Sequence, residues 1–293
     1  MRTLNRHGFT LVELIVALAL GALVASAVYR AIVGTQRVTQ AGAQKMDVQQ
    51  NLRAGATYLG SLIRELDASD GDISVATATR LQFRSMRWVA PLCDAPAPSG
   101  PTAVLLTLRR AATFGLRSPS AVEDSVLVFS DGDPGTRTDD VWLVGAVTGL
   151  VGSACTDGAA AVSLTVEITA ASGGQAAVLA GVTFGAPMRG FQPEELSLFQ
   201  AADSRWWMGQ RTANRLGSWT PVRPLVGPLA AGGLGFTYHD TTGAATAVLT
   251  DIASVGIALR GESQQRVRGL GGNIDYARDS ILTRAALRNN ARF

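Results

Sequence analysis

Residues 9–29 read FTLVELIVALALGALVASAVY, an apolar run of 21 residues. As an α-helix rising about 1.5 Å per residue it would be about 31 Å long, enough to cross the hydrocarbon core of a bilayer. Glu13 is the one charged residue within it, and Arg2 and Arg6 precede it. Because basic flanks stay cytoplasmic, we expect the N-terminus inside and the rest of the chain exported. A secretory signal peptide and an ordinary single-span anchor share this layout.

The composition predicts a folded body behind this stretch. The chain has 293 residues, of which 47% are hydrophobic, too many for a disordered protein. His7 and His239 are the only histidines, which excludes a His-rich metal site and leaves a His-dependent catalytic triad only if His239 serves it. Of the 26 basic residues only Lys45 is a lysine, and the arginines are spread along the chain. We therefore expect neither an enzyme nor a dedicated nucleic-acid-binding domain.

A short motif at the mouth of the apolar stretch resembles a known processing signal. Residues 8–14 read GFTLVEL, with Gly8, the aromatic Phe9 and Glu13 in fixed spacing. This resembles the signal of type IV prepilins and of type II secretion pseudopilins. The resemblance covers roughly the first thirty residues and implies that a prepilin peptidase cuts between Gly8 and Phe9 and methylates the new amino terminus. His7 stands where the commonest leaders have lysine or arginine.

Glu13 needs a partner on physical grounds alone. A carboxylate within a membrane span costs about 2 to 3.5 kcal/mol on insertion scales. A chain that begins at Phe9 would carry an ammonium group one helical turn before Glu13, on the same helix face. Within one subunit this pair would ease insertion, and between subunits the carboxylate would neutralise a neighbour's amino terminus. The resemblance assigns the second role to this glutamate.

The pattern beyond the span predicts an α+β fold. Apolar residues at helical spacing up to residue 66 predict one helix over residues 9–66, with 9–29 in the membrane and 30–66 amphipathic and packed on the soluble domain. After residue 70 the period becomes two, which predicts an antiparallel sheet. We expect strands near residues 73–75, 81–83, 104–108, 125–129, 141–144, 162–166, 178–184, 234–238, 245–249 and 252–259, with a turn at 239–243.

These strands suggest two β-rich parts. We place a leader at residues 1–8, the first β-rich part at 67–190 and the second at 225–293. The connection over 191–224 is rich in tryptophan and arginine, and its pattern predicts an extended loop or a short helix over 194–201. Such tryptophans either form a binding surface with arginines or simply pack a loop onto a sheet.

Two further groups of residues are candidates for a bond or a site. Cys93 and Cys155 are the only cysteines, and in an oxidising periplasm they would pair, the alternative being two free thiols. Four carboxylates within ten residues suggest either a calcium loop or a solvated hairpin, with no acidic side chain at the twelfth position. These carboxylates belong to Asp131, Asp133, Asp139 and Asp140. Calcium is the one cofactor that the sequence suggests.

The C-terminal arginines suggest either a DNA-binding surface or, more plainly, a solvated face. They are Arg260, Arg266, Arg268, Arg278, Arg284, Arg288 and Arg292. Length, the absence of proline before Pro91 and the segments 225–243 and 255–260 resemble PilW-type minor pilins and J-type minor pseudopilins. That resemblance implies a subunit that primes or caps a filament for twitching, adhesion or DNA uptake. Its partners would be other minor pilins or pseudopilins, the major subunit, the prepilin peptidase and the inner membrane.

The same resemblance implies a single-pass inner-membrane protein with a periplasmic C-terminal domain, which becomes extracellular after assembly. The sequence leaves open whether the machine is a pilus, a secretion pseudopilus or a DNA-uptake filament. Two alternatives from other classes are a membrane-anchored exported enzyme and a surface binding module.

Overall fold

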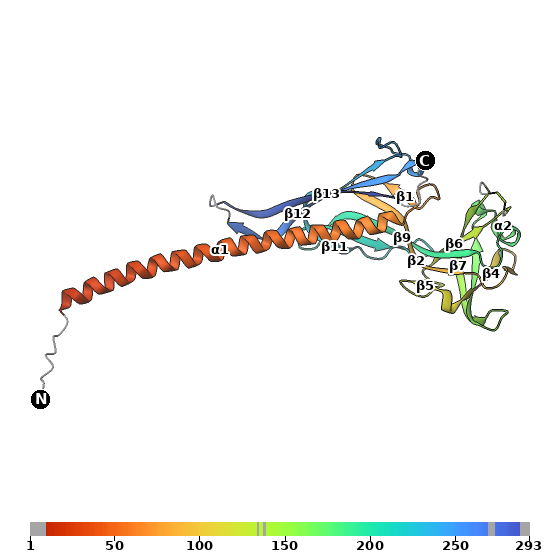
Figure 1. Ribbon diagram of the computed structural model, residues 1–293, viewed down its shortest axis with the longest axis horizontal. Helices are drawn as coiled ribbons and strands as arrows, with labels where there is room; N and C mark the ends of the chain where they lie inside the picture. Colours follow the sequence, from red (N-terminus) through yellow and green to blue (C-terminus); the bar gives the residue numbers. More distant parts are fainter. Residues whose placement is uncertain (1–9, 134, 137–138, 269–272, 288–293) are drawn as a thin grey trace, which may run out of the picture.

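The computed structural model describes residues 10–133, 135–136, 139–268 and 273–287. Helix α1 (Leu11–Arg64) is continuous over 54 residues and is the longest element of the molecule (Figure 1). Thr10 caps its first turn, and no proline lies within it, so no backbone donor is lost along its length. The predicted helix over residues 9–66 is therefore confirmed over the residues described.

The rest of the described chain is mainly antiparallel β-structure, which confirms the α+β class. Its 13 strands join in one sheet. They are β1 (Ile73–Ala76), β2 (Arg80–Pro91), β3 (Ala97–Ser99), β4 (Ala103–Arg109), β5 (Phe114–Gly115), β6 (Ser125–Ser130), β7 (Val141–Ala154), β8 (Ala160–Ile168), β9 (Pro187–Gln200), β10 (Trp206–Thr212), β11 (Arg223–His239), β12 (Ser254–Arg268) and β13 (Ile274–Ala286). A short helix, α2 (Gly174–Gly181), and three 3₁₀ turns at Arg110–Ala112, Ala170–Ser172 and Leu249–Asp251 complete the fold.

Strand β9 belongs to two halves of this sheet. Its first residues pair with β6, at Val126 opposite Gly190, and its last residues pair with β10, at Met208 opposite Leu198. Strand β2 runs along its other side. We call α1, β1 and β10–β13 the helix lobe, and β3–β8 with α2 the distal lobe. The long strands β2 and β9 pass from one lobe into the other (Figure 1).

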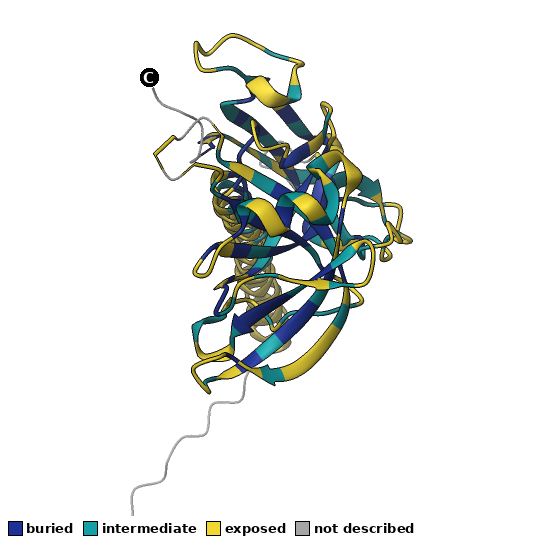
Figure 2. Cartoon of the chain, turned by 90° about the vertical axis from the view of Figure 1, so that its right-hand side faces the viewer, coloured by how far each residue is buried: buried dark blue, intermediate teal, exposed yellow. Residues whose placement is uncertain are grey.

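Each lobe has its own apolar core. In the helix lobe, one stripe of the C-terminal half of α1 packs on β10–β13 through Val48, Leu52, Ala56, Leu59 and Ile63. In the distal lobe, the buried side chains come from β2, β4, β6, β7, β8 and α2. Figure 2 shows buried segments on the strands, next to intermediate and exposed ones, and mainly exposed loops. Each lobe therefore packs around its own core, and strands β2 and β9 connect the two lobes.

Two buried carboxylates mark the crossing point between the lobes. Glu194 and Glu195 are adjacent in β9 and almost wholly buried. The Glu194 carboxylate lies 2.9 Å from the Arg87 guanidinium, and Glu195 accepts two hydrogen bonds of 2.9 Å from Arg211. Because a buried charge is tolerated only when it is paired, these contacts tie β9 to β2 on one side and to β10 on the other.

Three local predictions were wrong. Residues 178–184 overlap α2 rather than forming a strand, because a short apolar run has no period that separates helix from strand. Residues 245–249 make one isolated bridge, at Ala245, and then enter a 3₁₀ turn. The connection 191–224 is not one extended loop, and no helix forms over 194–201, since β9, β10 and the start of β11 occupy most of this segment. The sequence pattern did not indicate these strands, because charged residues that are buried in ion pairs interrupt the apolar alternation. The turn at 239–243 is present, with Gly243 at φ 86°.

Replacement of Gly190 by alanine is expected to destabilise the distal lobe. A methyl group there would overlap the Trp88 ring, whose indole nitrogen donates a 2.8 Å hydrogen bond to Asp124. Overpacking of this kind costs about 1–3 kcal/mol. Urea denaturation of the full chain in detergent measures the change. Gly152→Ala is the matched control, since no atom lies within 4 Å of a methyl group at that position; an equal loss in both variants would contradict the prediction.

The Glu195 contacts are expected to make stability depend on pH. Burial raises the pKa of Glu195, but hydrogen bonds from Arg211 and Gln82 outweigh it and hold the pKa below its usual value of 4.5. A lowered pKa contributes stability above the pKa of the unfolded chain, and this is lost as the pH falls through the folded value. The difference in unfolding free energy between wild type and Glu195→Gln should therefore shrink from about pH 7 to about pH 3. A difference that stays constant would refute this.

Candidate functional site

The N-terminal half of α1 is an apolar surface without a partner in the described chain. Every residue from Thr10 to Ile32 is exposed, and the helix leaves the sheet before this segment (Figure 1). Its length and composition suffice to cross a membrane. Exposure of so large an apolar surface to water is unfavourable. Lipid or other apolar helices are its expected surroundings. The exposed large side chains are Leu11, Val12, Leu14, Ile15, Val16, Leu18, Leu20, Leu23, Val24, Val28, Tyr29 and Ile32.

Glu13 lies in the first turn of this surface and forms a capping box with Thr10. The backbone N–H and the hydroxyl of Thr10 both donate to Glu13 Oε2, each at 3.0 Å. In return the Glu13 N–H donates to the Thr10 hydroxyl at 3.3 Å. The carboxylate thus sits at the positive end of the helix dipole. Sequence reasoning missed this motif, although the Thr-x-x-Glu spacing signals it; Gly8 and Phe9 lie outside the described residues.

The described chain therefore combines an exposed apolar helix of membrane-span length with a large antiparallel β domain. The family model described as the prokaryotic N-terminal methylation motif matches residues 3–29. That match, which includes Gly8, Phe9 and Glu13, identifies the N-terminus as a prepilin-type segment, as in type IV pilins and pseudopilins. No curated protein and no solved structure matched the chain.

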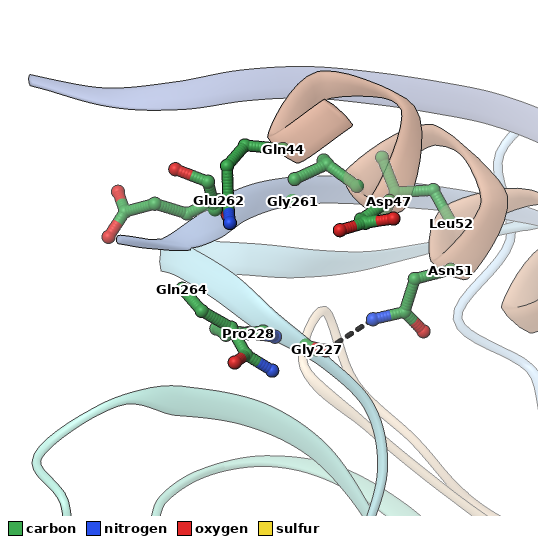
Figure 3. A pocket seen from close by; sticks show the side chains of 11 residues that line it. Gln44, Asp47, Asn51, Leu52, Gly227, Pro228, Gly261, Glu262 and Gln264 are labelled. Carbon is green, nitrogen blue, oxygen red and sulfur yellow. Dashed lines mark hydrogen bonds between the residues drawn. The ribbon is translucent and has the colours of Figure 1, made fainter. Parts of the chain in front are cut away.

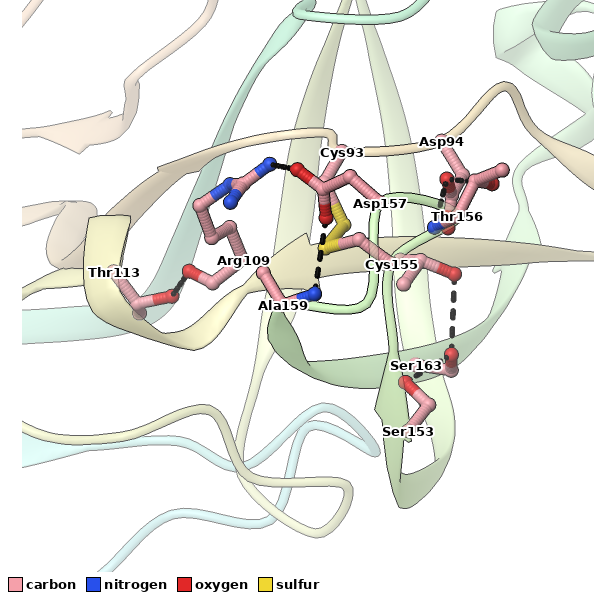
Figure 4. The surroundings of a disulfide bond; sticks show 11 residues. Cys93, Asp94, Arg109, Thr113, Ser153, Cys155, Thr156, Asp157, Ala159 and Ser163 are labelled. Atoms are coloured by element: carbon pink, nitrogen blue, oxygen red, sulfur yellow. Dashed lines mark hydrogen bonds and ion pairs between the residues drawn. A yellow bond between two sulfur atoms is a disulfide. The ribbon is translucent and has the colours of Figure 1, made fainter.

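The two cysteines meet in the distal lobe (Figure 4). Cys93 follows β2, Cys155 follows β7, and they form a disulfide with their Cα atoms 5.8 Å apart. The same two loops are joined by Asp94, which accepts hydrogen bonds from the backbone and the hydroxyl of Thr156. Because 62 residues separate the cysteines along the chain, the bond closes a long loop that contains β3–β7.

The predicted calcium residues lie in the loop between β6 and β7. The Asp139 carboxylate accepts a 2.8 Å hydrogen bond from the Asp133 N–H, and Asp133 accepts one of 3.0 Å from Gly135. These are contacts of a polar turn. Among the described residues no three His, Cys, Asp or Glu side chains gather as a metal site. Calcium binding by Asp131, Asp133, Asp139 and Asp140 stays a prediction.

A small polar cavity of about 220 Å³ lies where α1 meets β11 and β12 (Figure 3). Gln44, Asp47 and Asn51 line it from the helix, and the Asn51 side chain donates a hydrogen bond to the Gly227 carbonyl. Gly261 of β12 faces Leu52 at a distance that leaves little room for a side chain. The cavity therefore lies within the interface between α1 and the sheet. The sequence pattern did not indicate this cavity.

The arginines proposed for DNA contact are partly engaged within the protein. Arg278 lies 3.0 Å from Glu262 and 3.8 Å from Asp275, and Arg266 stacks over the Tyr276 ring. In the tryptophan-rich segment, Arg211 stacks over Trp219. Arg288 and Arg292 lie outside the described residues. A DNA surface stays a prediction.

Exported protein is expected to contain the Cys93–Cys155 bond. Non-reducing peptide mass analysis should detect one disulfide-linked pair of peptides, whereas two free thiols would contradict the prediction. The double substitution Cys93→Ser and Cys155→Ser should lower the unfolding free energy by about 4 kcal/mol or less, because the unfolded chain regains the freedom of a long loop. Wild type treated with reductant is the matched control and should lose the same amount.

Proposed function

We propose that this chain is a minor pilin of a type IV pilus, a non-enzymatic subunit that primes or caps the filament. The observation that carries the proposal is the exposed apolar half of α1 with Glu13 in its first turn, inside the segment that the methylation motif matches. Such a surface is stable in a bilayer and equally in a filament core made of like helices. It therefore serves the same molecule before and after assembly.

The proposed assembly step is a transfer of one ion pair. After cleavage behind Gly8, the methylated amine of Phe9 is a cation at the helix start. In the membrane its proposed partner is the Glu13 carboxylate of the same subunit, four residues further along the chain. In the filament the carboxylate of one subunit neutralises the amine of a neighbour. Because unpaired charge is costly in an apolar core, this exchange sets the axial position of each subunit.

A minor role is supported by the size and form of the soluble part. A major subunit repeats along the filament, so a large β domain with a second, projecting lobe is harder to pack there than at an end. The distal lobe continues from β2 and β9 beyond the end of α1 that packs on the sheet (Figure 1). We accordingly place the chain at or near the tip. Its partners are other minor pilins and the major subunit, with the helix in the inner membrane before assembly.

A minor pseudopilin of a type II secretion system is the second candidate. The same methylation motif and helix support it. Deletion of the gene separates the two, with pilus number and exported-enzyme secretion measured in one strain. Loss of pili with normal secretion supports the proposal, and loss of secretion with normal pili supports the alternative.

Glu13→Ala is expected to reduce incorporation into filaments by about tenfold or more, the equivalent of one lost charge pair of roughly 1.4 kcal/mol. Sheared and purified filaments are probed for the subunit, with total membrane levels as reference. Thr10→Ala is the matched control, because it removes the hydroxyl of the capping box and keeps the carboxylate. Incorporation of Glu13→Ala at the wild-type level would refute the proposed role.

Mass analysis of the mature N-terminus is part of the same experiment. The proposed processing predicts a chain that begins at methylated Phe9 in wild type and in Glu13→Ala alike. An intact leader in the wild-type protein would instead support an ordinary anchor that carries an exported enzyme or binding module.

A further inference from the structure

Strand β13 forms one edge of the sheet. Within the described residues it pairs with β12 and with no other strand. From residue 278 to residue 286 its register with β12 is regular, since the bulge between these strands lies further on, opposite residues 262–266. Proteins usually protect long edges with bulges, prolines or covering segments. This part of β13 contains neither proline nor glycine.

The direction of the backbone groups along this edge follows from three contacts. The Leu287 N–H donates to the Ala253 carbonyl, next to the first residue of β12. Because hydrogen-bonded and non-hydrogen-bonded residues alternate along an antiparallel pair, the odd-numbered residues of β13 bond to β12. In β11, Phe236 lies opposite Ile257, and its N–H points away from β12, to Ala78, as this alternation requires. The N–H groups and carbonyls of Leu282 and Arg284 therefore point away from β12, past the edge of the sheet. The Ser280 N–H does so as well and is already satisfied by Asp279, at 2.8 Å.

A groove accompanies the open edge on the helix side. It lies between residues 281–285 of β13 and one stripe of α1, which is formed by Arg53, Ala56, Thr57, Gly60, Ser61 and Arg64. No atom approaches within 4 Å of the place where a side chain on Gly60 would begin, so the stripe leaves space above the helix. Neighbouring strands in a sheet lie about 4.8 Å apart. A strand added to β13 would therefore run over this stripe.

Two arginines give the groove a positive charge. Arg53 and Arg64 line it from α1, and none of the ion pairs found among the described residues involves them. Arg284 contacts His239 on the outer face of the sheet. The Asp279 carboxylate accepts hydrogen bonds from the Gln49 side chain, at 2.6 Å, and from Ser280, and these bonds together with the charges of Lys45 and Arg53 lower its pKa.

We propose that the β13 edge from residue 280 to residue 286 binds an extended acidic segment of a partner protein. The segment adds as a further antiparallel or parallel strand, with its backbone bonded to Leu282 and Arg284. Alternate side chains of the segment then face α1, where carboxylates meet Arg53 and Arg64. Main-chain bonds supply the affinity and the two arginines supply the choice of partner.

Charge favours a partner other than a second copy of this chain. Two β13 edges brought together would place like charges from α1 on both sides of one groove, which is unfavourable. An acidic strand meets no such repulsion. Leu282, which is 81% exposed, would also be covered on the outer face by a strand that pairs beside it.

The test uses the full chain in detergent micelles and two synthetic octapeptides, one of alternating glutamate and threonine and one of alternating lysine and threonine. Residue-resolved hydrogen exchange reports the amides of β13. The glutamate peptide should slow exchange at Leu282 and Arg284 by about tenfold, while Ser280 changes less and the lysine peptide has no effect. Leu282→Pro should abolish the effect, because proline removes an outward N–H that an edge strand can spare. Leu282→Ala is the matched control and should retain it.

The double charge reversal Arg53→Glu and Arg64→Glu leaves β13 unchanged and should transfer the preference to the lysine peptide. If circular dichroism shows that Leu282→Pro does not fold, this charge-reversed variant still tests the proposal. Equal effects of both peptides, or no effect of either, would overturn the proposal. So would a wild-type dimer in sedimentation that the charge reversal strengthens, since the occupant would then be a second copy.

Discussion

One stripe of α1 packs on the sheet, and this contact sets how the helix and the β domain lie relative to each other. Leu59 and Ile63 are fully buried there, and Gly55 and Gly261 let the helix and strands approach closely. Because the helix is held by such contacts from Val48 to Ile63, over about four turns, this packing also sets its direction beyond the sheet. The exposed apolar half therefore projects from the β domain along a defined axis. A membrane or filament that takes up this half also orients the domain.

The second constraint is the shared strand β9, which must be central in both lobes at once. A central strand buried on both faces usually reads as an apolar run. Here it carries Glu194 and Glu195, and their partners Arg87 and Arg211 come from the strands on either side. Removal of one partner would leave a buried charge, so the pairs fix the register at the crossing point more strictly than apolar contacts would.

The sequence predicted the long helix and the antiparallel sheet because each rests on a periodic pattern that many residues repeat. It failed where a few residues decide the structure. The strand β9 was hidden because its glutamates are paired by residues distant in the chain, and α2 was mistaken for a strand because eight residues carry no clear period. The strand β13 escaped notice because it has only one buried residue and its charged residues interrupt the apolar alternation. Of the candidate site, Glu13 was readable from spacing, whereas the capping role of Thr10 needed the helix start to be known.

The capping box also bears on how one carboxylate could serve two tasks. Both Thr10 donors contact Oε2 of Glu13, so the cap occupies one oxygen of the carboxylate. The other oxygen can accept from an ammonium group without loss of the cap, since a carboxylate has about four acceptor positions. Under the proposed function, Thr10 remains in the mature chain, next to the amine of Phe9. The helix start would then stay ordered whether Glu13 pairs with its own amino terminus in the membrane or with a neighbour's in the filament, and the exchange of partners would cost no unwinding of the first turn.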